Sequence, residues 1–353
     1  MKERKLKINF DDISNNEKRH LKSRITNSIH SYIQKKRRLR YGISVAAASV
    51  VILLSIGIFN NVINKDSQIE NFVKTLDKSN PESIQTVKLL LNDDQNIEIA
   101  DTNASISYSS TGEEVTIGDL ESVSQKSTKN KAIAFNTLIV PYGKRSEIKL
   151  ADGSKVWLNS GSKLVFPVSF VGDRREVYLE GEAIFEVSHD ANHPFIVKAN
   201  NHEIEVLGTV FNVSNYIDEN TINTVLKSGS VQINFDNGSF LSSSKSIKIK
   251  PGTMAMYHRH QKSVTASKVD VEKHFSWRTG IFIFKKDPLD VIMKKISRYY
   301  NIDIIINDEV LANETFSGYL DVKDNVENVI NSIKETTDFQ YSINENKILI
   351  NKN

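Results

Sequence analysis

The chain has 353 residues and no cysteine, which excludes disulfides, cysteine-ligated zinc, iron–sulfur clusters and thiol nucleophiles. Hydrophobic residues make up 39% and charged residues 25%, as in a globular protein with two or three folded units. Residues 1–40 hold 13 basic and 4 acidic residues (+9), whereas the rest of the chain holds 33 basic and 39 acidic residues (−6). Such a basic tail is typical of segments that meet nucleic acid, an anionic membrane or an acidic partner.

Residues 1–40 are predicted to contain one basic helix. Ser14 and Glu17 have the spacing of a capping box, in which each side chain accepts a backbone N–H of the first turn. An apolar residue then recurs at every fourth position, at Leu21, Ile25, Ile29 and Ile33. A single helix has nothing of its own to cover this stripe, so the helix either docks on a cytosolic partner or lies on a membrane surface.

Residues 41–63 are predicted to form a transmembrane helix. The 24 residues between Arg40 and Lys65 carry no formal charge. At ~1.5 Å per residue, Tyr41–Ile63 spans about 34 Å, enough to cross a hydrocarbon core of about 30 Å. Because the basic residues gather at 35–40, the positive-inside rule puts the N-terminus in the cytoplasm and the large C-terminal body on the other side.

After a polar segment at 64–86, which predicts a linker, the pattern becomes β-rich over 87–270. Short alternating runs are separated by turn pairs such as Glu180-Gly181. A unit of three strands and two polar turns is found at 89–108 and again at 148–166. We therefore expect an all-β domain, either solenoid-like or sandwich-like.

Residues 280–351 alternate between strands and helices. Asp287 and Pro288 are residue types that start a helix, and Asn301 can end it. Asp324 can cap a second helix. The resulting order, β-α-β-β-α-β-β, predicts a small two-layer α+β domain.

Sequence motifs for catalysis or cofactor binding are absent. The chain has no P-loop, no dinucleotide-binding fingerprint, no H-E-x-x-H and no G-x-S-x-G. His258 and His260 would share a strand face, but no acidic residue lies near them in sequence, so a solvated strand face is preferred over a metal site. We expect no cofactor, no metal and no ordinary enzyme activity.

Four strings occur in order in the β-rich body, namely Val140–Gly143, Leu150–Ser162, Arg175–Val187 and Val206–Val213. Together they resemble the FecR family of membrane-anchored anti-sigma factors, in the form usual for Bacteroidota. The residues from 280 onward resemble the C-terminal module of these proteins, which is related to the short N-terminal domain of secretins and TonB-dependent receptors. Its recognisable points are Arg298-Tyr-Tyr300 and Phe316-Ser-Gly318.

The resemblance implies an anti-sigma factor of the inner membrane with a periplasmic body. Its partners would be an extracytoplasmic-function sigma factor in the cytosol, bound through Leu21, Ile25, Ile29 and Ile33, and the N-terminal signalling domain of a TonB-dependent outer-membrane transducer. An intramembrane protease could release the sigma factor, and no direct contact with nucleic acid is expected. The alternative is a membrane-anchored periplasmic binding or scaffold protein with the same β body.

The resemblance also implies one self-cleavage site. In some family members a bond matching Gly208-Thr209 is cut by an N-to-O acyl shift, in which the threonine hydroxyl attacks the preceding carbonyl and water hydrolyses the ester. A glycine tolerates the backbone strain that this step needs. The alternative is that Gly208 forms a bulge between two strands and that Thr209 is an ordinary strand residue.

Overall fold

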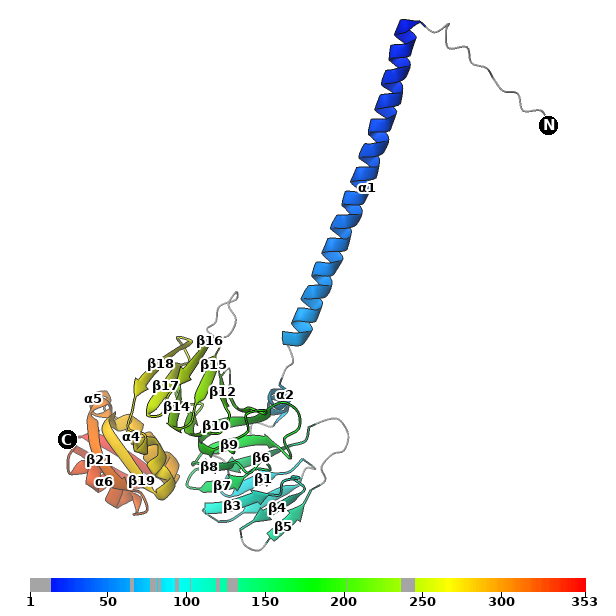
Figure 1. The fold of residues 1–353 in the computed structure, drawn as a ribbon. Coiled ribbons are helices and arrows are strands. Elements are labelled where there is room, and N and C mark those ends of the chain that lie inside the picture. The colour runs from blue at the N-terminus through cyan, green and yellow to red at the C-terminus, as the bar shows by residue number, and fades with distance from the viewer. Residues whose placement is uncertain are drawn as a thin grey trace. The chain divides into compact units, whose positions relative to one another are not determined.

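The computed structural model describes residues 14–63, 67–76, 81, 84–92, 95–101, 103–118, 121–125, 133–200, 202–235 and 245–353. The chain divides between Asp66 and Ser67 into two units. The first unit contains one long helix, and the second contains all strands and the shorter helices of the described residues (Figure 1).

Helix α1 runs from Asn15 to Ile63 without interruption. The predicted capping box is confirmed: Ser14 N–H donates to Glu17 Oε2 at 3.1 Å, and Glu17 N–H donates to Ser14 Oγ at 3.3 Å. The segment predicted to cross a membrane lies in the second half of α1, where the side chains of 42–47 and 56–63 are outside the described residues. Within the part of the chain that the structure describes, no helix is both long and apolar enough to cross a membrane.

Helix α2 (Gln68–Thr75) lies in the segment for which the sequence predicts only a linker. Its Ile69 is buried in a small cluster with Phe135, Val165 and Tyr178 of the body. Phe72 adds an aromatic contact, with its ring centroid 5.2 Å from that of Phe135. Part of the expected linker is therefore a helix packed on the body.

The body consists of two β layers that share one strand, β10 (Arg175–Glu186). The first layer contains, in spatial order, β2 (Asn96–Ile99), β1 (Val87–Leu90), β6 (Phe135–Val140), β9 (Ser162–Pro167), β10, β11 (Phe195–Ala199), β12 (His202–Val206), β15 (Val231–Phe235) and β16 (Lys245–Ile249). All of these pairings except β10–β11 are antiparallel.

The second layer completes the body. In spatial order it contains β5 (Glu121–Ser124), β4 (Glu114–Ile117), β3 (Asn103–Tyr108), β7 (Arg145–Lys149), β8 (Lys155–Leu158), β10, β13 (Val210–Asn215), β14 (Thr221–Ser228), β17 (Thr253–His258) and β18 (Ser263–Lys268). Both layers contribute to one hydrophobic core, so the all-β expectation for this part holds (Figure 1).

Strand β10 changes layer at Gly181. Residues up to Glu180 pair with β9 and β11, and residues from Gly181 onward pair with β8 and β13. Gly181 has φ of 90°, which L side chains rarely adopt, and a Cβ there would lie 2.5 Å from Ser162 Oγ. The predicted turn at Glu180-Gly181 is therefore wrong: it is a corner inside a continuous strand.

The two predicted repeat units each form three strands, β1–β3 and β7–β9. In the first unit the hairpin lies in the first layer and the third strand in the second layer, and in the second unit this is reversed. The repeated apolar positions that are fully buried point into the common core; they include Leu89, Ile106, Ile148, Val156 and Leu164. The two units thus supply complementary halves of the sandwich. The first turn position of the repeat, residue 93, is outside the described residues.

The C-terminal module follows a short connection made of α3 (Glu272–Phe275) and the 3₁₀ helix η3 (Ser276–Thr279). Its elements are β19 (Ile281–Pro288), α4 (Leu289–Tyr300), β20 (Asp303–Ile306), α5 (Glu309–Asn313), β21 (Thr315–Asp321), α6 (Val326–Lys334), β22 (Phe339–Asn344) and β23 (Lys347–Lys352). Strand β19 pairs with β21, and β20, β23 and β22 form a second sheet. The order matches the expected one except for the added short helix α5.

The helix ends of this module differ slightly from the sequence expectation. Pro288, not Asp287, is the N-cap of α4, and Asn325, not Asp324, caps α6 by accepting the N–H of Asn328. Asn301 ends α4 in the left-handed conformation, as predicted. The apolar stripe of α4 is buried and consists of Leu289, Ile292, Met293 and Ile296.

Candidate functional site

The predicted sigma-binding residues lie on the first half of α1. Leu21, Ile25, Ile29 and Ile33 have exposed fractions of 53%, 52%, 51% and 46%. At 100° per residue, positions four apart follow a slowly winding stripe on one side of the helix. The structure therefore presents four large apolar side chains to solvent on a basic helix, an arrangement that costs free energy unless a partner or a lipid surface covers it.

Gly208 and Thr209 lie in a bend between β12 and β13. Thr209 is buried, and its hydroxyl donates to the carbonyl oxygen of Ser230 at 3.1 Å. The carbonyl oxygens of Leu207 and Thr209 accept the N–H groups of Asp190 and Val187 at 2.8 and 3.0 Å. The bond between the two residues is thus held on both sides by hydrogen bonds.

Gly208 is required by space and not by a left-handed backbone. It is not among the described glycines with positive φ. A Cβ on Gly208 would lie 2.6 Å from Nδ1 and 2.8 Å from Cα of His189. Gly229 also packs closely against Thr209. A Cβ added to Gly229 would lie 2.7 Å from Thr209 Oγ1, so a larger residue would not fit there. The self-cleavage hypothesis invokes backbone strain at the Gly208–Thr209 bond. The φ angle of Gly208 shows no such strain, since it is not positive.

A second site, which the sequence does not single out, lies where the body meets the C-terminal module. Arg298 of α4 donates from Nη2 to both carboxylate oxygens of Asp218, at 2.9 and 2.8 Å, and from Nη1 to Glu219 at 2.7 Å. Its guanidinium lies 3.8 Å from the ring centroid of Tyr216. Burial raises the pKa of Tyr216 well above its ordinary value, so the phenol keeps its proton and donates to the Ser160 carbonyl at 2.9 Å.

Further contacts fix the same junction. Arg145 of β7 donates to the carbonyl of Trp277 at 3.0 Å and lies 4.9 Å from the ring of Tyr299. Arg278 lies 4.6 Å from the ring of Trp157. The hydrophobic cluster of the module also includes two residues of the body, Ile184 and Val225. The body and the module therefore meet through packed, charged and aromatic contacts together.

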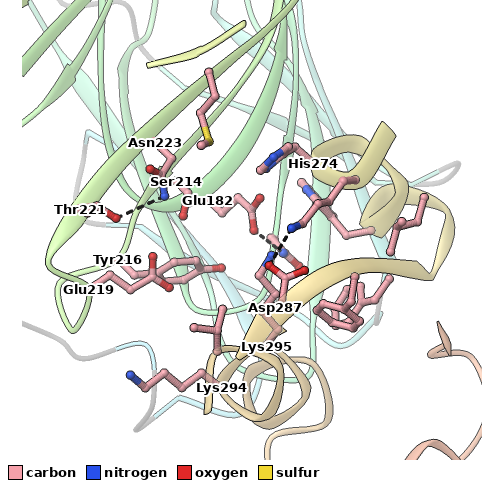
Figure 2. A pocket seen from close by; sticks show the side chains of 18 of the residues that line it. Glu182, Ser214, Tyr216, Glu219, Thr221, Asn223, His274, Asp287, Lys294 and Lys295 are labelled. Atoms are coloured by element: carbon pink, nitrogen blue, oxygen red, sulfur yellow. Dashed lines mark hydrogen bonds and ion pairs between the residues drawn. The ribbon is translucent and has the colours of Figure 1, made fainter. Parts of the chain in front are cut away.

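A pocket of about 670 Å³ opens beside Arg298. One wall comes from β13, β14 and β17 of the body and the other from α3, β19 and α4. Figure 2 shows Glu182, Ser214 and Tyr216 on the body side, and His274 and Lys295 on the other. A pocket of this size and mixed lining is typical of small-molecule sites between domains.

The ionisable side chains of this pocket are held in defined states. Buried Glu182 accepts hydrogen bonds from the amides of Asn159 and Asn212 at 2.9 and 3.0 Å. Burial lowers the pKa of His274 to about 3, and the positive charges of Lys295 and Lys273 lower it further, while Asp287 opposes them. The imidazole is therefore neutral at physiological pH.

The residues that the structure describes contain no group of three or more His, Asp or Glu side chains arranged to hold a metal ion. The sequence signal closest to the junction was Arg298-Tyr-Tyr300, which marks the family without revealing the partners of Arg298. Those partners lie about 80 residues earlier in the chain, in the loop between β13 and β14.

Two family models match the chain: FecR protein over residues 136–232 and FecR, C-terminal, over residues 281–350. Two crystal structures of a candidate anti-sigma factor from Parabacteroides distasonis ATCC 8503, at 1.65 and 2.50 Å resolution, are similar to it with TM-scores of 0.56 and 0.57. In both cases the identity is 26%, and the alignment covers 62% of this chain and 99% of the other. No curated protein sequence matches significantly.

The first matched region lies within the β body, and the second covers almost all of the module to which Arg298 belongs. Residues 136–232 and 281–350 are thus similar to the two parts of FecR proteins.

Proposed function

We propose that the protein is an anti-sigma factor: it holds an extracytoplasmic-function sigma factor in the cytosol and controls it in response to a signal outside. The observation that carries this proposal is the match to both FecR models together with the similarity to the Parabacteroides candidate anti-sigma factor over almost all of that protein. The matches of the β body and of the C-terminal module to FecR models support a regulatory role over a purely enzymatic one.

The sigma factor is bound by the exposed stripe of α1. Four apolar side chains about half exposed on a capped helix supply the kind of helix face that docks into a partner groove. The basic residues around the stripe favour a partner with an acidic surface, because complementary charges speed association and orient the complex. Leu21, Ile25, Ile29 and Ile33 form the contact.

The second half of α1 anchors the protein in the inner membrane. The uncharged residues 41–64 and the +9 charge that precedes them support a single span with the N-terminus in the cytoplasm. The body and the C-terminal module then lie in the periplasm. A continuous α1 from Asn15 to Ile63 supports a direct mechanical link between the anchor and the sigma-binding stripe.

The periplasmic part receives the signal from the N-terminal signalling domain of a TonB-dependent outer-membrane transducer. A single span has few internal states with which to carry a signal by conformation alone, so an intramembrane protease releases the sigma factor by cutting the anchor. The resemblance of the module to the short N-terminal domain of such receptors supports this partner.

Self-cleavage at Gly208-Thr209 is a further part of the proposal. Oγ1 of Thr209 attacks the carbonyl carbon of Gly208 and forms an ester while the C–N bond breaks, leaving a free amine on Thr209. Water then hydrolyses the ester to the Gly208 carboxylate and the original hydroxyl. The close approach of Gly229 to Thr209 Oγ1 and to the carbonyl oxygen of Gly208 supports this geometry.

Co-purification tests the sigma-factor proposal. The full-length chain is expressed with each extracytoplasmic-function sigma factor of its own genome, and retained sigma factor is measured. We expect one sigma factor to be retained by the parent and lost from the Ile25→Asp, Ile29→Asp variant. The matched control is Asn27→Asp, Ser31→Asp, which adds the same charge on the opposite side of α1 and should retain it. Equal behaviour of the two variants would contradict the proposal and favour a membrane-anchored binding or scaffold protein.

A further inference from the structure

The pocket beside Arg298 has more positive charge than its own carboxylates neutralise. Each lining carboxylate already has a partner in the fold. Asp218 and Glu219 bind Arg298, and Asp287 accepts from Lys273 Nζ at 2.6 Å and from the Lys285 N–H at 2.7 Å.

The two other lining carboxylates are also engaged. Glu182 accepts from two amides, and Asp270 accepts the N–H of Glu272 at 3.1 Å. Among the described residues, neither of these two carboxylates lies within 4.0 Å of a lysine nitrogen of the lining.

Four lysines that line the pocket have no close carboxylate partner. Among the described residues, Lys268, Lys285 and Lys295 have no carboxylate within 4.0 Å, and Lys294 reaches Asp290 only at 3.9 Å. Lys268 ends β18 of the body, whereas the other three belong to β19 and α4 of the module. The surplus is therefore contributed from both sides of the junction.

A buried donor in the same pocket also lacks a partner. Trp277 lines the pocket and is only 5% exposed, yet its Nε1–H finds no acceptor among the described residues. An unsatisfied buried donor costs free energy comparable to a lost hydrogen bond, so native structures rarely leave one without a reason. An acceptor atom supplied by a ligand would remove that cost.

Carbon-rich side chains complete the lining. Met254 and Met256 of β17 and Ile283 and Val291 of the module stand beside the lysines. Such surfaces bind the carbon skeleton of a ligand while a few polar groups orient it.

We propose that this junction pocket is a binding site for a small organic anion, a molecule bearing a carboxylate, sulfate or phosphate group on a carbon skeleton. Its anionic group pairs with Lys295 and Lys268, and its carbon skeleton packs against the apolar side chains of the lining, which include Trp277. Because the lysines come from both the body and the module, the bound ligand strengthens the docking of one on the other. Binding here is independent of whether α1 holds a sigma factor.

The two tryptophans of the chain, Trp157 and Trp277, allow a direct readout. Trp157 does not line this pocket and packs under Arg278. In a full-length Trp157→Phe variant, all tryptophan emission comes from Trp277, so occupation of the pocket changes that emission. In the Trp277→Phe variant the remaining Trp157 emission should stay constant.

The probes are three pairs that differ in charge: 3′-sialyllactose against lactose, glucose 6-phosphate against glucose, and N-acetylglucosamine 6-sulfate against N-acetylglucosamine. We expect at least one anion to give a saturable change of Trp277 emission that its uncharged counterpart does not give. The pair that responds identifies the carboxylate, phosphate or sulfate as the preferred group. Added salt should weaken the binding.

Calorimetry on lysine variants completes the test. Lys295→Gln and Lys268→Gln should each weaken binding of the responding anion by roughly 10-fold, the lower end of the range for loss of one hydrogen bond to a charged group. The control Lys352→Gln replaces an exposed lysine at the end of β23 and should leave binding unchanged. The proposal is overturned if no anion binds at up to 10 mM, if charged and uncharged members bind equally, or if the three lysine variants behave alike.

Discussion

Nη2 of Arg298 donates two hydrogen bonds, of 2.9 and 2.8 Å, to the carboxylate of Asp218, although the two residues are 80 positions apart in the chain. Arg298 belongs to the α+β module and Asp218 to a loop of the β body. The two terminal nitrogens of this buried arginine bind two different carboxylates, Nη2 that of Asp218 and Nη1 that of Glu219, so the planar guanidinium fixes orientation as well as distance. The pair therefore acts as a latch between the β body and the C-terminal module.

Breaking this latch should loosen the module. Arg298→Ala removes the partner of Asp218 and Glu219, both of which are exposed enough to regain water, so we expect a loss of about 2 kcal/mol in the free energy of unfolding. Limited proteolysis between β18 and α3 should become faster. The exposed Arg174→Ala is the control and should change neither. Unaltered proteolysis of the Arg298 variant would contradict the latch.

A buried histidine should make stability depend on pH. Burial lowers the pKa of His202 to about 4, and the positive charge of Arg259 lowers it further. Because the unfolded chain takes up this proton near pH 6.5 and the folded chain does not, the free energy of unfolding should fall as pH drops from about 6.5 to 4, by about 3 kcal/mol in total. Above pH 6.5 this contribution to the pH dependence vanishes.

Comparison of variants isolates His202, since His274, whose pKa is lowered to about 3, acts in the same direction. A phenylalanine at position 202 fits beside the rings of Tyr257 and Phe235. In His202→Phe, the decrease in the free energy of unfolding between pH 6.5 and 4, measured by urea unfolding, should therefore be smaller than in the parent. His260→Phe replaces an exposed histidine and should show the same decrease as the parent. An identical pH profile for the parent and His202→Phe would show that the buried imidazole does not resist protonation.

The corner of β10 should depend on a glycine. Gly181→Ala would place a Cβ 2.5 Å from Ser162 Oγ and 2.6 Å from Ser162 Cα, at a φ of 90°. Overpacking and backbone strain together should lower the free energy of unfolding by about 3 kcal/mol. Gly172→Ala, at φ of 96° but with no atom within 4 Å, separates the two causes and should cost only about 1 kcal/mol. Equal losses in the two variants would contradict the steric part of the argument.

Self-cleavage predicts two fragments. On a denaturing gel the purified chain should separate into residues 1–208 and 209–353, because an acyl shift onto the Thr209 hydroxyl followed by hydrolysis cuts the chain between these two residues. Thr209→Ala should leave one full-length band, and Thr209→Ser, which keeps a hydroxyl, should still cleave. Thr253→Ala, in β17, is the control. A single full-length band for the parent would rule out the reaction.

Local sequence rules predicted the local structure well. The capping box of Ser14 and Glu17 and the left-handed Asn301 depend only on neighbouring residues, and both formed as expected. The repeated apolar positions of the β body also lie where alternation placed them, in the core. Such features are visible in sequence because their physical causes act within a few residues.

Features that depend on distant parts of the chain were missed. Glu180-Gly181 has the composition of a turn, yet pairing with different strands on each side keeps β10 continuous through it. In the sequence, Ile69 lies in a polar segment that predicts a linker. In the structure it is buried in a hydrophobic cluster with residues of the body. The proposed anion site contains both Lys268 and Lys295, and no spacing rule connects two residues that line one pocket only because the module packs on the body.

Competition between this protein and core RNA polymerase for the sigma factor tests directly whether the protein is an anti-sigma factor. The full-length chain, in detergent, is titrated into a complex of its sigma factor with core RNA polymerase, and the sigma factor that remains on the polymerase is measured. We expect the parent to remove the sigma factor and the Ile25→Asp, Ile29→Asp variant to need at least tenfold more protein, whereas Asn27→Asp, Ser31→Asp should match the parent. A sigma factor that stays on the polymerase at every concentration of the parent would contradict this expectation.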